Sequence, residues 1–257
     1  MVDFFPELAG QIRDQRKEQI TIRQLLQMRA GYPDEEYNRP YLDSLFFSDN
    51  WHWLPHIVRF PLSGDPGTEF AYSNLTSHIL AVIVARATDT DLESYAQRHL
   101  FSPIDAELGS WSRDADGYNY GCNEISVTAR DMAKFGSLYL NDGVYEGKRV
   151  LPADWIEASL QRYSEGIDRS GEGRGKHGRY LSDVGYGYQW WSATVGEHRF
   201  DYAAGHGGSL IVLLDELDMI IVTTADPLYE LPAESGWKFE GAIIDLVGRF
   251  IGSLPKR

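Results

Sequence analysis

The sequence predicts an α+β fold, in which a mainly helical part is followed by an antiparallel sheet that a C-terminal helix covers. Two observations support this prediction. Apolar residues recur at helical spacing through much of the first part of the chain, whereas continuous apolar runs typical of buried strands dominate the last part. We therefore divide the chain into a helical part, residues 1–185, and a sheet part, residues 186–257, within one integrated domain.

The helical part shows start signals as well as periodicity. Thr21 is a candidate N-cap, and Pro152 suits the first turn of a helix. Residues 32–65 and 164–185 are rich in Gly, Pro, Asp, Asn or Ser, which predicts irregular loops. The predicted helices are 22–28, 75–87, 92–100, 129–140 and 152–161.

The sheet part consists of short apolar segments between polar turns. Residues 210–214 and 219–224 are continuous apolar runs joined by 215–218, which indicates a hairpin inside a covered sheet. Two further strands are predicted at 186–191 and 200–204. The amphipathic segment 237–251 predicts the helix that covers one face of the sheet.

Composition excludes several classes of function. The chain has 257 residues, of which 43% are hydrophobic, but it has no apolar run of the ~20 residues needed to span a membrane. Its net charge of −14 argues against nucleic-acid or anionic-membrane partners, since phosphates would be repelled. Cys122 is the single cysteine, so no internal disulfide is expected. The first residues lack signal-peptide features, and both a cytoplasmic and a periplasmic location stay open.

A first candidate motif, Tyr72-Ser73-Asn74, follows the Pro66-Gly67 turn and precedes an apolar helix. With a turn between them, the Tyr72 and Asn74 side chains could face one cleft, where the amide could hold a lysine or a substrate carbonyl. A tyrosine can act as a base only if nearby cations stabilise its phenolate. The structural alternative is that Tyr72 packs at the helix start and Asn74 caps it.

A second candidate motif is Gly205-His206-Gly207-Gly208-Ser209. Glycines allow a substrate backbone to lie close, and the Ser209 N–H would supply one oxyanion-hole donor. Protonated His206 is a candidate cation. The structural alternative is a glycine-bearing bend that enters a strand. An α/β-hydrolase is not supported, because the chain has no Gly-x-Ser-x-Gly nucleophile elbow.

Both motifs resemble active-site motifs of the serine β-lactamase and penicillin-binding-protein superfamily, nearest to the class C β-lactamase-related ester and amide hydrolases. Further segments resemble that superfamily in the same order, namely Pro6-Glu7-Leu8, residues 21–26 and residues 128–135. The resemblance implies a β-lactamase/transpeptidase-like fold and a serine acyl-enzyme, with no cofactor or metal. The substrate would be a small ester, amide or lactam, or a short peptide. The implied catalytic residues are Tyr72, Asn74 and His206, and the implied substrate and oxyanion groups are Gly207, Gly208 and Ser209.

The third motif of the superfamily, Ser-x-x-Lys with its nucleophilic serine, does not occur in residues 1–65. We therefore expect the nucleophile, and the N-terminal part of the sheet, to lie outside this chain. The alternative is a truncated or degenerate, non-catalytic member that binds an acyl or peptide ligand without turnover. A Ser-x-x-Lys string occurs at Ser235-Gly236-Trp237-Lys238, but it follows both other motifs, and chance occurrence is the better explanation.

Three further expectations follow. The segment from His52 to His56 mimics a zinc-binding helix, but it lacks the glutamate and contains Pro55. Four tryptophans, which are named at the end of this paragraph, could line an acyl pocket or be ordinary core residues. A chain without the nucleophile helix would expose apolar surface, so we expect low stability or self-association. The tryptophans are Trp51, Trp53, Trp190 and Trp191.

Overall fold

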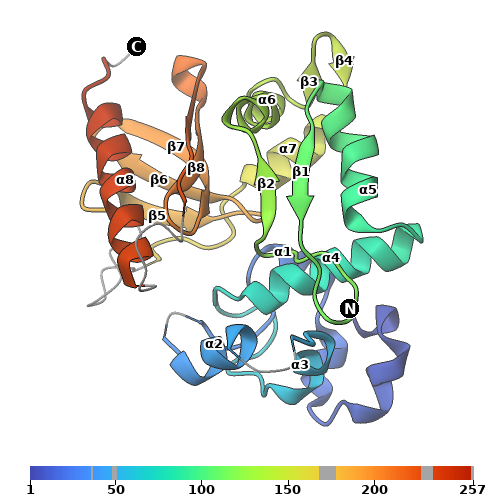
Figure 1. Cartoon of the computed structure of the whole chain (residues 1–257). Helices are drawn as coiled ribbons and strands as arrows, with labels where there is room; N and C mark the ends of the chain where they lie inside the picture. Colours follow the sequence, from blue (N-terminus) through green and yellow to red (C-terminus); the bar gives the residue numbers. More distant parts are fainter. Residues whose placement is uncertain (36, 48–50, 168–177, 227–233, 256–257) are drawn as a thin grey trace. The chain divides into compact units, whose positions relative to one another are not determined.

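The computed structural model describes residues 1–35, 37–47, 51–167, 178–226 and 234–255 (Figure 1). The chain separates into two compact units, Met1–Ser126 and Val127–Arg257. This division differs from the predicted subdivision at residue 185, because the helices that follow residue 127 belong to the same unit as the sheet. The predicted α+β class with an antiparallel sheet and a C-terminal helix is confirmed.

The first unit is mainly helical. Short 3-10 segments come first, and a π-helical turn, Gln97–Phe101, continues the last α-helix. Its other elements are η1 (Val2–Phe4), η2 (Pro6–Gln11), η3 (Gln15–Gln19), α1 (Ile22–Leu26), α2 (Arg39–Phe46), α3 (Leu54–Arg59), α4 (Asn74–Thr88), α5 (Leu92–Ala96), η5 (Ser102–Ile104), β1 (Leu108–Trp111) and β2 (Ile125–Val127), whose last residue begins the second unit. The helices predicted at 22–28, 75–87 and 92–100 are therefore present, with shifted ends.

The prediction of an irregular loop over residues 32–65 is wrong, because this segment contains α2 and α3. Each helix has a proline, Pro40 or Pro55, within its first turn. A proline is tolerated there, because its missing N–H has no intrahelical acceptor and its fixed φ suits a helix start. Proline marks helix starts in this segment, although a segment rich in Pro, Asp and Asn predicts irregular structure.

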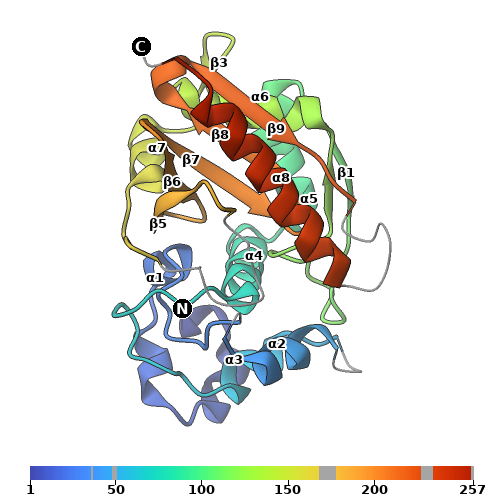
Figure 2. The same ribbon diagram turned by 90° about the vertical axis from the view of Figure 1, so that its left-hand side faces the viewer.

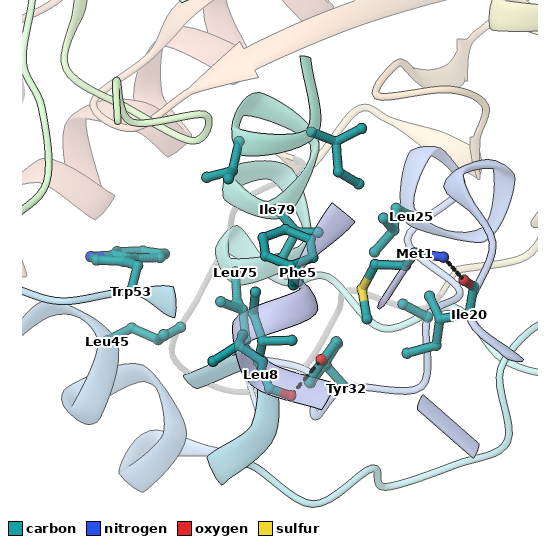
Figure 3. Packing of buried hydrophobic residues seen from close by; sticks show 14 of the residues in the cluster. Met1, Phe5, Leu8, Ile20, Leu25, Tyr32, Leu45, Trp53, Leu75 and Ile79 are labelled. Carbon is teal, nitrogen blue, oxygen red and sulfur yellow. Dashed lines mark hydrogen bonds between the residues drawn. The ribbon is translucent and has the colours of Figure 1, made fainter. Parts of the chain in front are cut away.

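The core of the first unit forms around α4 (Figure 3). Leu75, Ile79 and Val82 of this helix are fully buried, as the helical spacing of apolar residues predicts. The aromatic rings of Phe5 and Trp53 are almost as deeply buried in the same cluster. Burial of each such side chain contributes about 1.5–3 kcal/mol, so α4 is the central stabilising element of this unit.

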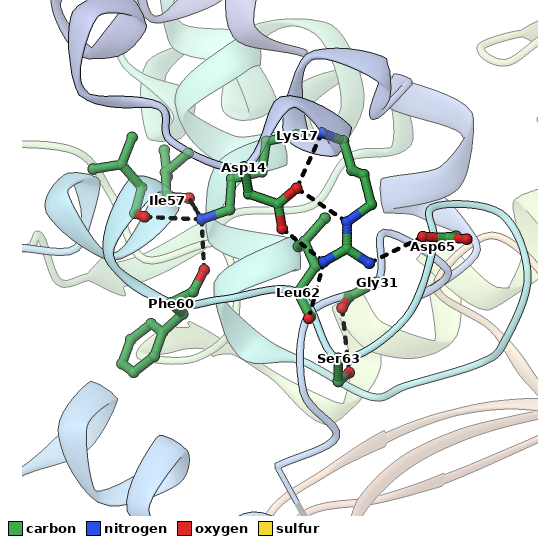
Figure 4. A network of polar contacts seen from close by, with 10 residues as sticks. Asp14, Lys17, Gly31, Ile57, Phe60, Leu62, Ser63 and Asp65 are labelled. Atoms are coloured by element: carbon green, nitrogen blue, oxygen red, sulfur yellow. Dashed lines mark hydrogen bonds and ion pairs between the residues drawn. The ribbon is translucent and has the colours of Figure 1, made fainter.

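A buried lysine from η3 binds the carbonyl oxygens at the C-terminal end of α3 (Figure 4). Lys17 is only 1% exposed, and its Nζ donates to the carbonyl oxygens of Ile57, Val58 and Phe60. The last carbonyls of a helix have no intrahelical partner, and the ammonium group supplies one. Burial lowers the pKa of Lys17 to about 8. Lys17 therefore has a structural role.

In the described residues, the second unit is built on a five-stranded antiparallel sheet with the order β5-β6-β7-β8-β9. The strands follow one another along the chain, and α6, α7 and α8 accompany them. The elements are α6 (Ala129–Leu140), β3 (Val144–Tyr145), β4 (Lys148–Arg149), α7 (Ala153–Leu160), β5 (Ser182–Tyr186), β6 (Trp191–Val195), β7 (His198–Gly205), β8 (Ser209–Leu214), η6 (Asp215–Leu217), β9 (Met219–Thr223) and α8 (Glu234–Gly252).

Helices α6 and α8 cover opposite faces of this sheet (Figure 2). A side chain at Gly136 of α6 would meet Ile211 and Leu213, so the glycine allows a close approach to β8. Val195 lies against Gly252 of α8, and the strand register places Val195 on the face opposite to Ile211. The apolar runs of β8 and β9 are thus the strands of a covered sheet, as predicted.

The predicted strand 186–191 is wrong. Tyr186 ends β5, and Trp191 begins β6 as its direct partner across the ladder, so residues 187–190 form the connection of a hairpin. Gly187 belongs there because a Cβ would lie 2.2 Å from the Ser159 carbonyl oxygen. The aromatic residues on both sides of this turn made two strand ends resemble one strand. The predicted loop over 164–185 likewise contains most of β5, and its residues 168–177 lie outside the described residues.

Candidate functional site

The six predicted site residues form two groups. Tyr72 and Asn74 belong to the first unit, at the start of α4. The other group belongs to the second unit, at the turn between β7 and β8, and consists of His206, Gly207, Gly208 and Ser209. Each group has its own supporting contacts.

Ser73 is the N-cap of α4. Its backbone is extended, and its Oγ accepts a hydrogen bond from the Thr76 N–H at 3.4 Å. The same hydroxyl is hydrogen-bonded to the Tyr41 hydroxyl at 2.8 Å, and Ser73 is fully buried. These contacts are those of an N-cap. The alternative that Asn74 caps the helix is therefore wrong, because Asn74 is already the first helical residue.

Asn74 is held by a buried carboxyl group that the sequence analysis did not single out. The backbone N–H of Asn74 donates to Oε1 of Glu35, and its Nδ2 donates to Oε2 at 2.7 Å. Glu35 is only 2% exposed. Burial raises the pKa of Glu35 to about 8, although the N–H groups of Asn74 and Leu75 act in the opposite direction. One carboxyl group thus fixes both the backbone and the side chain of Asn74.

Tyr72 is fixed through its backbone by the same segment. Its N–H donates to Oδ2 of Asp34 at 3.1 Å, and its carbonyl oxygen accepts from the Glu35 N–H at 3.0 Å. The residue is half-buried. Residues 34–35 therefore anchor the motif on both sides of Ser73, although they lie far from it in the sequence.

The second group is shaped by two glycines with left-handed backbone. Gly207 has φ = 85° and Gly208 has φ = 104°, a backbone region that residues other than glycine rarely adopt. A Cβ at Gly208 would lie 2.7 Å from Cδ1 of Ile243 in α8. The Gly208 carbonyl oxygen accepts from Oγ1 of Thr223 at 2.6 Å. Backbone conformation and close packing both require glycine here.

A second glutamate holds this turn. Oε2 of Glu240, in α8, lies 3.2 Å from Nδ1 of His206 and accepts from the Gly207 N–H at 3.2 Å. The Glu240 side chain is 8% exposed, whereas that of His206 is 41% exposed. An ionised carboxylate accepts hydrogen bonds only, so Nδ1–H donates to Glu240 and Nε2 faces away from it. Helix α8 thereby orients the imidazole as well as the turn.

The alternative nucleophile candidates lie at the two ends of α8. Ser235 falls within its first turn, and the side chains of Ser235 and Lys238 lie outside the described residues. A second Ser-x-x-Lys string, which the sequence analysis missed, begins at Ser253. The Ser253 hydroxyl donates to the Phe250 carbonyl oxygen at 2.7 Å, and Lys256 lies outside the described residues.

The zinc-like segment has ordinary structural contacts. Nδ1 of His52 pairs with Asp116 at 2.7 Å, and His56 is buried with its ring stacked on Phe60. Pro55 lies in the first turn of α3 and does not break the helix. Within the described part of the chain, no group of three or more His, Cys, Asp and Glu side chains is placed to hold a metal ion.

Three of the four tryptophans are core residues. Trp53 belongs to the core of the first unit, and Trp190 and Trp191 are buried in the second, where Trp190 packs on Tyr139. Trp51 is 49% exposed. The core alternative therefore holds for the three buried rings.

No described helix is both long and apolar enough to cross a membrane.

Comparison with known proteins identifies the family and the fold. The family model described as Beta-lactamase matches residues 3–238. The chain belongs to the beta-lactamase family. Over 172 residues this beta-lactamase-family chain is 28% identical to the 6-aminohexanoate-dimer hydrolase of Paenarthrobacter ureafaciens, a match that covers 62% of this chain and 43% of that protein.

Solved structures share the fold of this beta-lactamase-family chain. A Bacillus anthracis protein assigned as a 6-aminohexanoate-dimer hydrolase has a TM-score of 0.68 at 22% identity, over 99% of this chain and 66% of that one. A D-stereospecific amidohydrolase from Streptomyces sp. has a TM-score of 0.58 at 18% identity, over 82% and 70% of the two chains. The chain thus spans less than two thirds of the length of the Paenarthrobacter ureafaciens protein and of the Bacillus anthracis protein.

Proposed function

We propose that this chain carries two of the three motifs of a serine hydrolase site that cleaves ester, amide or lactam bonds through an acyl-enzyme. The observation that carries the proposal is the anchored Tyr72-Ser73-Asn74 segment at the start of α4, in a chain of the beta-lactamase family. An acyl-transfer site needs a base and an amide held in fixed positions, because misplaced groups lose much of their rate advantage. Glu35 and Asp34 supply that rigidity.

Each motif has a defined role in this proposal. Tyr72 acts as the base that takes the proton of the nucleophilic serine, and His206 is the candidate cation of the second motif. Asn74 contacts a lysine or the substrate carbonyl through its amide. Gly207 and Gly208 let the substrate backbone approach, and the Ser209 N–H donates to the developing oxyanion.

The nucleophilic serine, on this proposal, is not among residues 1–65, where no Ser-x-x-Lys occurs. The relatives named above suggest amides as the first substrates to try: the linear 6-aminohexanoate dimer and a D-amino-acid amide. The absence of the string before Tyr72 also favours a second candidate function, a non-catalytic member that binds an acyl or peptide ligand without turnover. Self-association of the chain stays a prediction.

The deciding experiment treats the folded 257-residue chain with a fluorophosphonate and then with penicillin G, and measures the intact mass. We expect no adduct, together with measurable penicillin G binding that Y72F and N74A weaken. An adduct that maps to Ser235 would contradict the placement of the nucleophile outside the chain, and S235A would verify the assignment. Absence of binding of penicillin G and both amides to the folded chain would contradict both candidate functions.

A further inference from the structure

Glu35 is a buried ionisable group that contacts both the backbone N–H and the side-chain amide of Asn74. Its two oxygens accept from the backbone N–H and from Nδ2 of that residue. A backbone anchor alone would need one oxygen only. The second contact therefore acts on the side-chain amide, which is the part of Asn74 that an acyl ligand would meet.

The protonation state of this carboxyl group determines how the amide can be oriented. An ionised carboxylate accepts hydrogen bonds only, so the amide must direct Nδ2 toward Glu35 and Oδ1 away from it. A neutral carboxyl group donates from one oxygen, so Oδ1 of Asn74 can turn toward Glu35 and Nδ2 away from it. With ionised Glu35, Asn74 therefore offers the ligand the acceptor Oδ1, which suits an ammonium group. With neutral Glu35, Asn74 can offer the donor Nδ2, which suits a carbonyl oxygen.

We propose that Glu35 is a positioning residue that sets which end of the Asn74 amide faces the ligand. Ionised Glu35 leaves Oδ1 of Asn74 facing the ligand, and neutral Glu35 leaves Nδ2 of Asn74 facing it. The inference rests on the proposed function for its consequence in ligand binding, because a carbonyl ligand is held only by the donor end. The contact between Glu35 and Asn74 itself does not depend on that function.

The surroundings of Glu35 place its titration within an accessible range. Among the described residues, the groups that interact electrostatically with it are Asp34 on its own segment, Tyr41 on α2, and Cys122. Burial, followed by the charge of Asp34, raises the pKa of Glu35 to about 8. Burial also raises the pKa values of the Tyr41 hydroxyl and the Cys122 thiol, so both stay neutral where Glu35 ionises.

The first test observes the amide directly. Side-chain amide signals of a chain labelled with ¹⁵N-asparagine are followed by NMR from pH 6 to pH 10, and the Asn74 pair is assigned from its loss in N74A. We expect this pair to shift with a midpoint near pH 8 in the wild type and to be independent of pH in E35Q. Y41F is the matched control, because it removes a buried hydrogen bond to Ser73 and leaves both hydrogen bonds between Glu35 and Asn74 in place.

The second test measures penicillin G binding at pH 6.5 and pH 9.5. The glutamine of E35Q can donate to Oδ1 of Asn74 and so imitates the neutral carboxyl group. Wild type and Y41F should bind about tenfold more weakly at pH 9.5, which corresponds to one lost hydrogen bond, whereas E35Q should keep its affinity.

The outcomes separate the two proposals. If E35Q shows the same Asn74 titration as the wild type, or if the wild-type signal does not move, the positioning role is contradicted even where the chain binds ligand. If ligand binds but its pH dependence is unchanged in E35Q, the role is contradicted as well. If no ligand binds while the Asn74 titration is present and is lost in E35Q, the proposed function fails and the positioning contact stands.

Discussion

Glu35 and Glu240 each anchor one of the two motifs, and they differ in what they hold. Glu35 binds the backbone and the side chain of a helical residue, Asn74, in a buried setting. Glu240 binds the Gly207 N–H and the ring of His206, whose side chain is 41% exposed. No residue of the first motif has left-handed backbone, so its geometry depends mainly on polar contacts. The second depends also on glycine conformation and on packing against α8.

This difference has a physical consequence. A contact made by a buried carboxyl group is sensitive to protonation, because ionisation in a low-dielectric setting is costly. A turn fixed by left-handed glycines is sensitive to added side-chain volume. We therefore expect pH to act on the first motif and substitution of glycine to act on the second.

The largest expected effect concerns stability and pH at Glu35. Its folded-state pKa is raised from 4.5 to about 8, so the folded state binds this proton more tightly than the unfolded state does. The stabilisation is complete below about pH 4.5 and is lost as pH rises to about 8, by roughly 5 kcal/mol. Urea unfolding between pH 5 and pH 9 should show this loss in the wild type and a much flatter profile in E35Q.

E240Q is the matched control for this prediction, since it alters the other anchoring glutamate. Burial also raises the pKa of Asp201 to about 6, but that contribution is common to all three proteins, so the difference between wild type and E35Q isolates Glu35. Equal pH profiles for E35Q and wild type would contradict the prediction.

The next effect concerns Gly208. G208A would place a Cβ 2.7 Å from Ile243 at a residue whose φ is 104°. We expect a loss of about 2–4 kcal/mol in the free energy of unfolding, from backbone strain and overpacking together. Urea unfolding of the variant and the wild type measures it.

G196A separates the two causes, because Gly196 also has positive φ but has open space around it. It should lose only about 1 kcal/mol, the strain part alone. If G208A costs no more than G196A, packing against α8 is not what requires glycine at Gly208.

The smallest effect concerns Glu240. E240A would leave the buried Gly207 N–H without its acceptor, which should cost about 1–3 kcal/mol. E240Q should cost less, because the amide oxygen can still accept from that N–H. Thermal unfolding measures both variants, and hydrogen exchange at Gly207 should be faster in E240A than in E240Q. Equal exchange in the two variants would show that the contact does not protect the turn.

Local signals in the sequence predicted several elements correctly. Helix α6 runs from Ala129 to Leu140 as expected, with Thr128 accepting from the Asp131 N–H as its cap. Thr21 and Gln24 likewise form a capping box at α1. These contacts join residues three positions apart, so the sequence itself displays them. The wrong predictions, at 32–65 and 186–191, fall where proline and aromatic residues are compatible with more than one local structure.

Residue types at short, fixed spacing are enough to predict the α+β class, the family resemblance and the two motifs. The contacts that hold those motifs become visible in the folded structure alone. Glu35 and Asn74 are 39 positions apart, and Gly207 and Glu240 are 33 apart. Contacts over such separations form only after helices and strands have packed, so no local pattern marks the two glutamates. Burial, which decides how Glu35 titrates, likewise exists only in the folded chain.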